Sequence, residues 1–281
     1  MLNRRSLLLA GGALLLLPAA LRFPGLIGTA QAQGGAAELG TAARPLRVGV
    51  TAGVHAQVLE VVRDVLAKEN FALRITEFSD FIQPNVALAA GEIDINTYQH
   101  LPFLETQRAQ RGYDFVPVGK TVLTVMGVFS KKHKALADLP NGARVAIPND
   151  PTNGGRALLL LAKAGVIGLK PGVDYRATVA DITENPKRIR ILELEAASIA
   201  RGLEDVDAAA ITGNYAVPAG LNPLKEGLAI EGADSAYTVL VVTRRGDENK
   251  PWAQKLARAY ADPAVKEFVE KAFGGAVIVG A

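Results

Sequence analysis

The segment "LRVGVTAGVHAQVLEVVRDVLAKENFALRITEF", residues 46–78, contains a short apolar run, an amphipathic stretch and a second apolar run in succession. The two apolar runs, residues 46–50 and 72–78, are predicted strands. Between them, aliphatic side chains recur at helical spacing and indicate one buried helix face, formed by Val58, Val61, Val62, Val65 and Leu66. The segment therefore predicts a strand, a helix and a second strand.

The same alternation continues along the chain. Pro84 can open a helix, residues 93–97 form an apolar strand pattern, and a further helix pattern runs from about His100 to Gln110. Strands that alternate with helices in this way form parallel sheets, because each helix carries the chain back across the sheet. The βαβαβ order predicts a mostly parallel sheet with helices on both sides.

Two extended segments, residues 121–130 and 237–244, bracket a second alternating set of strands and helices. Two amphipathic helix patterns follow the second extended segment, and we expect them to return the chain to the first sheet. The order predicts two α/β lobes joined by two chain crossings. Lobe 1 is expected to comprise residues 46–124 and 239–281, and lobe 2 residues 125–238.

Residues 1–32 have the pattern of an export signal peptide. Arg4 and Arg5 give a positive start, residues 7–17 are apolar, and residues 30–32 read Ala-Gln-Ala, a small-residue cleavage pattern. The paired arginines also suit the twin-arginine export route, although an ordinary leader can begin in the same way. A membrane anchor is less favoured, because several residues interrupt a run shorter than the ~20 residues of a span, namely Gly11, Gly12, Pro18 and Arg22.

The basic charge of the chain comes from its first residues. Residues 1–32 hold three of the 31 basic residues and no acidic residue, so 28 basic residues remain against 28 acidic ones. Residues 33–45, rich in glycine and alanine, form a predicted linker. A neutral body gives no electrostatic reason to expect nucleic acid as a partner. The chain contains no cysteine, which excludes disulfides, thiolate catalysis and an acylated cysteine.

Ligands of open α/β sheets collect at the carboxyl ends of parallel strands, and three predicted loops lie there. In the first, "IDINTYQHLPF", a strand leads into Tyr98, His100 and Phe103. Two aromatic rings beside an imidazole can form an apolar slot with one polar group. Alternatively, the rings belong to the core and His100 starts a helix. The histidines lack metal-ligand spacing, so we expect no metal site at His55, His100 or His133.

The second loop, "NDPTNGGRALLLLAKAG" (149–165), leads into an aliphatic helix. Asn153 or Thr152 can cap that helix. The two glycines that follow, Gly154 and Gly155, would let a ligand approach free backbone N–H groups, and a helix N-terminus favours anions.

Arg156 stands near the start of the same helix, where a positive charge opposes the helix macrodipole. A negative partner would make this position favourable. A ligand carboxylate could receive a bidentate, charge-assisted pair of hydrogen bonds from the guanidinium. A salt bridge to a nearby acid such as Asp150 is the alternative, and the local pattern leaves both open.

The third loop, "AAAITGNYAVPAG" (208–220), releases Asn214 and Tyr215 from a buried strand. The Asn214 amide could donate to a carboxylate or accept from an ammonium group, or it could cap a helix. The chain contains no Gly-x-Ser-x-Gly motif, and no set of acid, base and nucleophile is evident. Glu193 and Glu195 share one face of a strand, but solvation of a strand edge explains them equally well.

These loops resemble a known family. The strings "VGVTAG", "FSDFIQPN", "NTYQHLPFL", "AIPNDPTNGGRALLLL", "ITENPK" and "GNYA" are similar to motifs of the NlpA lipoprotein family, the methionine receptors of bacterial ABC importers, over about residues 46–280. The resemblance implies a bilobal periplasmic-binding-protein fold (type II-like), with two mostly parallel sheets and a hinge of two crossings. It also implies a small-molecule ligand between the lobes, no cofactor, and an ABC permease in the inner membrane as partner.

The resemblance also implies roles for single residues. The aromatic positions Phe81, Tyr98 and Phe103 would enclose the ligand side chain, and His100 would line the same pocket. Arg156 would hold the ligand carboxylate, and Asn214 would fix the amino-acid end of the ligand.

Three departures from the family pattern change what is expected. The cysteine that usually follows the leader is absent, so we expect a periplasmic protein without a lipid anchor. Thr124 stands where methionine-binding members tend to have tyrosine, and Val239 where they tend to have asparagine. Loss of one hydrogen bond to a charged ligand group weakens binding by about 1.5–3 kcal/mol, or roughly 10- to 100-fold in affinity. The sequence therefore also allows a ligand other than methionine.

The sequence predicts a periplasmic solute-binding protein that takes up an amino acid or a related small carboxylate. A dipeptide or an organic acid would suit the same fold. A periplasmic lyase or dehydratase and a ligand-free interaction module are the alternatives from other classes, and the missing catalytic set argues against the first.

Overall fold

The structure, a computed structural model, describes residues 38–232 and 236–280. The predicted signal peptide and residues 33–37 of the predicted linker lie outside the described residues. The remaining linker residues form turns that contact the first sheet, since Ala72 N–H donates to the carbonyl of Gly40 at 2.6 Å. Gly40 has a φ of 97°, and a Cβ there would lie 2.0 Å from the Phe71 ring.

The first sheet has five strands in the order β2-β1-β3-β13-β4. Strands β1, β2 and β3 pair in parallel, whereas β13 runs antiparallel to both β3 and β4. Four strands thus share one direction, which confirms the predicted mostly parallel sheet. The strands are β1 (Leu46–Thr51), β2 (Leu73–Phe78), β3 (Ile95–His100), β4 (Phe115–Lys120) and β13 (Val239–Arg244).

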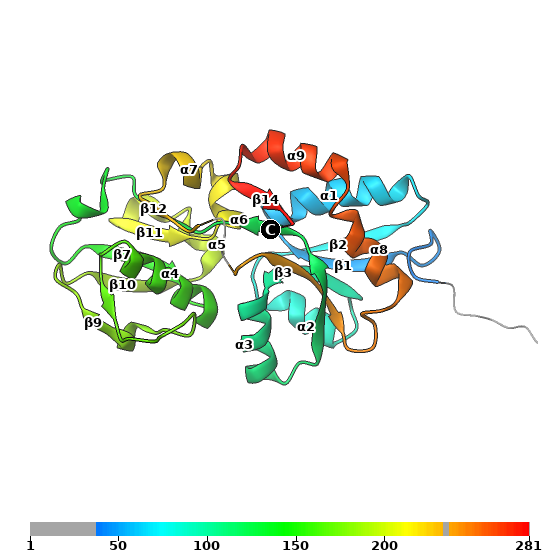
Figure 1. Ribbon diagram of the computed structural model, residues 1–281, viewed down its shortest axis with the longest axis horizontal. Coiled ribbons are helices and arrows are strands. Elements are labelled where there is room, and N and C mark those ends of the chain that lie inside the picture. Colours follow the sequence, from blue (N-terminus) through cyan, green and yellow to red (C-terminus); the bar gives the residue numbers. More distant parts are fainter. Residues whose placement is uncertain (1–37, 233–235, 281) are drawn as a thin grey trace, which may run out of the picture. The chain divides into compact units, whose positions relative to one another are not determined.

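Helices cover both faces of the first sheet (Figure 1). Strand β13 shows the alternation, because Val241 packs with one core cluster while Leu240 and Val242 pack with another. The cluster around Val241 includes helices α1 (Val54–Ala67), α8 (Pro251–Ala259) and α9 (Pro263–Phe273). The other cluster includes α2 (Gln83–Ala89) and α3 (Leu101–Arg111).

The second sheet has the order β10-β7-β11-β6-β12, and only β6 runs against the other four strands. The aliphatic helix α4 (Pro151–Lys163) packs on one face of this sheet, and short helices pack on the other. The strands are β6 (Gly127–Phe129), β7 (Arg144–Pro148), β10 (Arg190–Leu194), β11 (Ala208–Ile211) and β12 (Ala229–Ile230).

The apolar side chains of Ile199 and Leu203 favour one helix by their spacing, but the structure has no single helix there. Two pieces replace it, α5 (Ala196–Ile199) and the 3-10 helix η3 (Leu203–Asp205). Gly202 between them has a ψ of 12°, which ends the helical path. The other short helices are α6 (Gly213–Ala216), α7 (Pro223–Glu226), η1 (Leu136–Asp138), η2 (Val179–Asp181) and η4 (Val217–Ala219).

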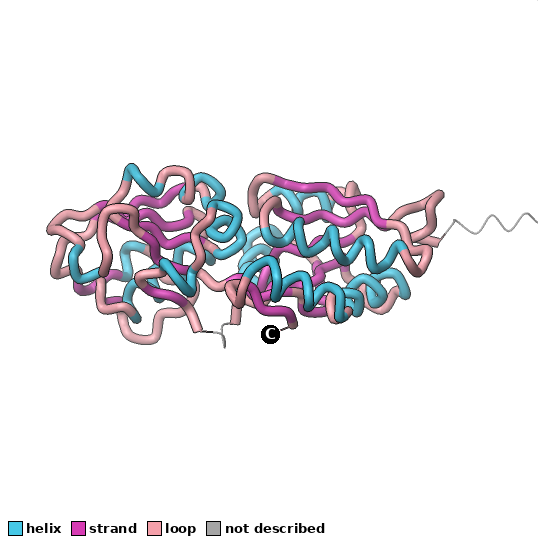
Figure 2. The backbone as a smooth tube through the Cα atoms, turned by 90° about the horizontal axis from the view of Figure 1, so that it is seen from above, coloured by secondary structure: helices cyan, strands magenta, loops and turns pink. Residues whose placement is uncertain are grey.

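The predicted extended segment 121–130 is not one strand. It divides into β5 (Val122–Thr124) and β6, and the chain passes to the second sheet between them. Strand β5 pairs with the last strand, β14 (Val277–Val279), so the end of the chain returns to the vicinity of the first crossing (Figure 2). A small antiparallel pair, β8 (Gly168–Leu169) and β9 (Ile182–Glu184), completes the strands.

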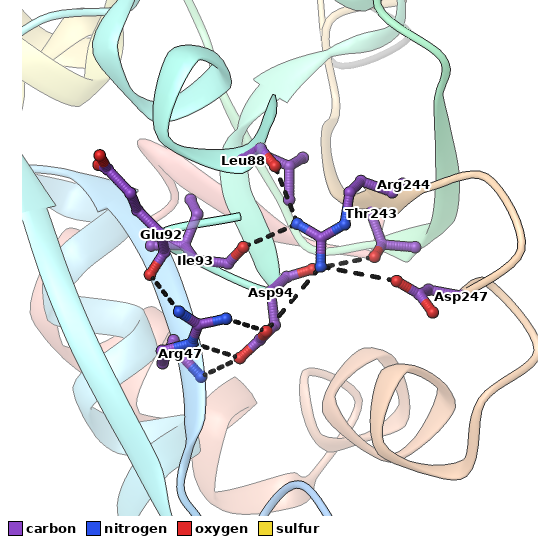
Figure 3. A network of polar contacts seen from close by, with 8 residues as sticks. All are labelled: Arg47, Leu88, Glu92, Ile93, Asp94, Thr243, Arg244 and Asp247. Atoms are coloured by element: carbon purple, nitrogen blue, oxygen red, sulfur yellow. Dashed lines mark hydrogen bonds and ion pairs between the residues drawn. The ribbon is translucent and has the colours of Figure 1, made fainter. Parts of the chain in front are cut away.

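An ionic network ties the amino ends of β1 and β3 to the carboxyl end of β13 (Figure 3). Asp94 is buried and accepts hydrogen bonds from the backbone and the guanidinium of Arg47, with Arg47 Nη2 to Asp94 Oδ1 at 2.6 Å. Arg244 donates to the carbonyls of Leu88 and Ile93, each at 2.8 Å. The network lies at the opposite end of β3 from His100, so it fixes the sheet without contacting the predicted site.

Within residues 38–232 and 236–280, the structure contains no helix that is both long and apolar enough to cross a membrane.

Candidate ligand-binding site

Loops that follow β1, β2, β3, β7 and β11 converge on one cavity. All of them leave their strands at the carboxyl end, as expected for α/β sheets. All six predicted site residues line this cavity. The full lining is His55, Phe81, Tyr98, Gln99, His100, Phe103, Thr124, Asn153, Arg156, Thr212, Asn214, Tyr237 and Val239.

Three aromatic rings form the apolar wall of the cavity. Phe81 lies 6.3 Å from both Tyr98 and Phe103, measured between ring centroids, and Tyr98 lies 6.0 Å from Phe103. Tyr98 and Phe103 are 3% and 2% exposed, so they are core residues and also line the cavity. The two alternatives left open by their spacing therefore both hold.

His100 caps helix α3 and lines the cavity at the same time. Its Nδ1 accepts from Phe103 N–H at 3.2 Å, and its Nε2 lies 3.2 Å from Asn153 Oδ1. Because Nδ1 accepts, Nε2 carries the hydrogen and donates to Asn153. Burial, and secondly the nearby Arg156 cation, lower the pKa of His100 to about 3, against the opposing Asn153 hydrogen bond. The imidazole is neutral at pH 7.

The start of helix α4 differs from the sequence prediction. Asp150 is the N-cap, and its carboxylate accepts from Asn153 N–H at 2.8 Å; neither Asn153 nor Thr152 caps the helix. Pro151 is then the first helical residue, so Arg156 lies in the second turn, where the macrodipole opposes a cation less than in the first turn. Burial raises the pKa of Asp150, and the hydrogen bonds from Asn153 oppose this rise.

Gly154 and Gly155 are helical residues, and they do not open the backbone to a ligand as predicted. A Cβ on Gly155 would lie 2.1 Å from the carbonyl oxygen of Tyr175, and one on Gly154 would lie 2.9 Å from that of Pro148. Both glycines therefore allow neighbouring backbone segments to pack closely against α4.

Arg156 has an internal anionic partner, Glu231, and no hydrogen bond to Asp150. Arg156 Nε donates to Glu231 Oε1 at 2.6 Å, and Arg156 Nη2 donates to Glu231 Oε2. The Tyr237 ring lies over the guanidinium, 4.1 Å from Cζ to the ring centroid. Only 3% of Arg156 is exposed, so the pair is buried. The bidentate pair of hydrogen bonds that we expected Arg156 to donate to a ligand carboxylate is donated to the Glu231 carboxylate instead.

Asn214 does not cap its own short helix; that N-cap is Thr212, which makes no side-chain hydrogen bond there. Instead, Asn214 contacts the segment after β1. Its Oδ1 accepts from His55 N–H at 3.0 Å, and its Nδ2 donates to the carbonyl of Ala52 at 2.8 Å. Asn214 thus joins the loop after β11 to the start of helix α1.

Among the cavity residues, His55 and Thr212 were not identified as site residues from the sequence, whereas Tyr98 was. His55, Tyr98 and Thr212 each hold a buried polar atom that no described residue hydrogen-bonds, namely His55 Nε2, Tyr98 Oη and Thr212 Oγ1. Burial lowers the pKa of His55 to about 3, so this imidazole is also neutral. His55 follows the carboxyl end of β1, so the strand-end rule could have found it. Glu231 carries no comparable signal.

A cavity with an aromatic wall, one buried guanidinium and unpaired polar atoms, placed at the strand ends of two α/β sheets, defines a small-molecule binding protein. No group of three or more histidine, aspartate or glutamate side chains within the described ranges could hold a metal ion. The chain belongs to the NlpA lipoprotein family, whose model matches residues 46–281.

Known proteins of this family are similar over most of the chain. The D-methionine-binding lipoprotein MetQ of Salmonella typhi is 44% identical, covering 84% of this chain and 88% of that protein. A nutrient binding protein from Burkholderia cenocepacia, solved bound to methionine, is 47% identical with a TM-score of 0.82, covering 84% of this chain and all of the other. A periplasmic substrate-binding protein of an ABC transporter from Coxiella burnetii is 46% identical with a TM-score of 0.80, at 84% and 100% coverage. These likenesses confirm the predicted family and fold.

Proposed function

We propose that this protein is the substrate-binding component of an ABC importer and binds an amino acid, methionine or a closely related small carboxylate, in the cavity between the two sheets. The observation that carries the proposal is the buried guanidinium of Arg156 at a cavity otherwise lined by aromatic rings and neutral polar groups. The names of similar proteins, which specify methionine and ABC transport, support the ligand class and the partner.

Each predicted residue has a role in this proposal. Phe81, Tyr98 and Phe103 enclose the ligand side chain, and His100 adds a neutral polar edge. Arg156 attracts the carboxylate through the N–H groups that Glu231 leaves available. Asn214 acts at the amino-acid end of the ligand and also holds the two sides of the cavity together.

The cavity also favours a second ligand class. Thr124 and Val239 both line it, at the two positions where the sequence departs from methionine-binding members of the family. The valine offers no hydrogen bond to a charged group, and the threonine offers a smaller side chain than tyrosine. A non-methionine amino acid, a dipeptide or an organic acid is therefore the alternative ligand for the same site.

We further propose that residues 1–32 direct export to the periplasm, by the twin-arginine or the general route. A chain without cysteine has no thiol to lipidate, which supports a receptor without a lipid anchor, although relatives are named lipoproteins. The partner would be the permease of the importer in the inner membrane. We propose no enzymatic activity, since the cavity residues carry out recognition without an activated nucleophile.

The test is calorimetry of the exported protein with L-methionine, other amino acids and dipeptides, after native mass spectrometry of gently purified protein has shown any retained ligand. Arg156→Ala removes the buried cation and should weaken binding by at least 10-fold, since hydrogen bonds to charged groups contribute about 1.5–3 kcal/mol. Arg245→Ala is the matched control, because Arg245 is half exposed and pairs with Asp114 away from the cavity.

Absence of binding to every carboxylate ligand, or an Arg156→Ala variant that binds like the wild type, would contradict the proposal.

A further inference from the structure

We infer that Glu231 sets the net charge of the ligand that this site accepts. The inference deepens the proposed function and rests on it. Glu231 belongs to the segment by which the chain returns from the second sheet to the first, and its side chain is 10% exposed. It does not line the cavity; it lines a neighbouring hollow together with Arg156, which borders both.

Contacts with the first chain crossing hold Glu231 in place. Its Oε2 accepts from the backbone N–H of Met126 at 2.8 Å, and its own N–H donates to the carbonyl of Met126 at 3.1 Å. Met126 lies in the first crossing, between β5 and β6. The carboxylate is therefore held by the backbone of Met126 as well as by the guanidinium of Arg156.

Glu231 also determines which N–H groups of Arg156 remain for a ligand. Arg156 Nε and Nη2 donate to Glu231, Nη2 donates further to the carbonyl of Thr124 at 3.2 Å, and Nη1 donates to Asn153 Oδ1 at 3.3 Å. A guanidinium has five N–H donors in a fixed plane. Contacts within the described chain occupy four of them, and a ligand carboxylate meets the remaining one on Nη1.

The charges around the cavity consequently balance before a ligand enters. Of the lining residues, Arg156 alone is ionised at neutral pH, because both histidines are neutral and burial raises the pKa of Tyr98. Glu231 cancels its charge at hydrogen-bond distance. Asp150, the N-cap of α4, does not line the cavity, and its buried carboxylate accepts hydrogen bonds from the backbone N–H and the side-chain amide of Asn153.

A buried site with balanced charge disfavours a ligand that brings a net charge. An amino acid carries a carboxylate and an ammonium and adds none, whereas the 2-hydroxy acid with the same side chain adds one negative charge. The structure thus assigns the site to zwitterions. Glu231 is a specificity-determining residue that acts through Arg156, and a neutral side chain there would admit the anion.

The experiment measures binding of L-methionine and of its 2-hydroxy analogue to the wild type, Glu231→Gln and Glu231→Asp. The wild type and Glu231→Asp should bind the amino acid at least 10-fold more tightly than the hydroxy acid. In Glu231→Gln that ratio should fall by 10-fold or more, because the two ligands differ in the ammonium group and the variant removes its attraction to the Glu231 carboxylate. Two unit charges about 8 Å apart at an effective dielectric of about 20 attract each other by an energy worth a factor of ~30 in affinity. Glu267→Gln, at an exposed ion pair with Lys271, should leave the ratio unchanged.

The possible outcomes separate this inference from the proposed function. If neither compound binds the wild type, the proposed function fails. If the amino acid binds but Glu231→Gln leaves the ratio unchanged, the role of Glu231 is overturned and the receptor stands. If Glu231→Gln does not fold, the wild type alone decides, since hydroxy acid binding as tight as that of the amino acid would overturn the inference.

Discussion

His55 and His100 both line the cavity as buried, neutral imidazoles, and both have pKa values lowered to about 3. Their neutrality follows first from burial, which opposes the charged form. Neutral rings preserve the charge balance of Arg156 and Glu231. They also couple the stability of the protein to pH.

We predict that the protein loses stability as the pH falls below about 6.5. The unfolded histidines bind protons near their usual pKa of about 6.5, whereas the folded ones do not until about pH 3, so the unfolded state holds more protons in this window. Each histidine should lower the free energy of unfolding by up to ~1.4 kcal/mol per pH unit. Urea unfolding at pH 7.5, 5.5 and 4.5 measures this slope.

The matched variant for this prediction is His55→Gln, which removes one titrating group. Its stability should depend on pH more weakly than that of the wild type, by about one proton between pH 6 and 4.5. Equal slopes for the two proteins would show that His55 does not contribute.

Helix α4 illustrates how one element fixes the site through its packing. Gly155 directly precedes Arg156. A Cβ added to Gly155 would lie 2.1 Å from the carbonyl oxygen of Tyr175. In an open helix, glycine to alanine would stabilise by about 0.8–1 kcal/mol. Overpacking against backbone costs about 1–3 kcal/mol, and a separation this short places the clash at the upper end of that range.

We therefore predict that Gly155→Ala lowers the free energy of unfolding by about 1 kcal/mol or more and weakens ligand binding, because relief of the clash displaces Arg156. Gly202→Ala is the control, since its Cβ would meet its nearest neighbour at 3.7 Å, an ordinary contact. Thermal unfolding and calorimetry of both variants check the prediction. A Gly155→Ala protein more stable than the wild type would contradict the packing argument.

The sequence predicted most elements, because strand and helix periods were clear in segments such as residues 46–78, whose strands and helix end within about three residues of the prediction. It did not predict the start of α4, since Asp150 and Asn153 are both good caps and only tertiary packing selects between them. Glu231 lies 75 residues from Arg156, and no local pattern links residues at that separation. The six site residues were found through strand ends and family resemblance, and their roles in binding stay a prediction.

Hydrogen bonds connect segments that follow strands of the first sheet to segments that follow strands of the second. Besides Asn214, Tyr215 Oη donates to the carbonyl of Ser79, and Tyr175 Oη donates to Glu105 Oε2, each at 3.2 Å. The predicted lobes, residues 46–124 with 239–281 and residues 125–238, would separate if the two crossings acted as a hinge. Contacts of this kind then exist only in the closed form and favour it without touching the ligand.

We predict that Tyr215→Phe weakens ligand binding by about 2- to 10-fold, the worth of one net hydrogen bond of about 0.5–1.5 kcal/mol. Tyr215 does not line the cavity, so the loss would arise from a smaller closed population, which lowers apparent affinity in proportion. Calorimetry gives the affinity, and small-angle X-ray scattering without ligand should show a larger radius of gyration for the variant. Tyr260→Phe is the control, because its hydroxyl pairs with Thr97 inside the first sheet and should affect stability alone. Equal affinities for Tyr215→Phe and the wild type would mean that this contact forms in open and closed states alike, and the hinge would then have to be sought elsewhere.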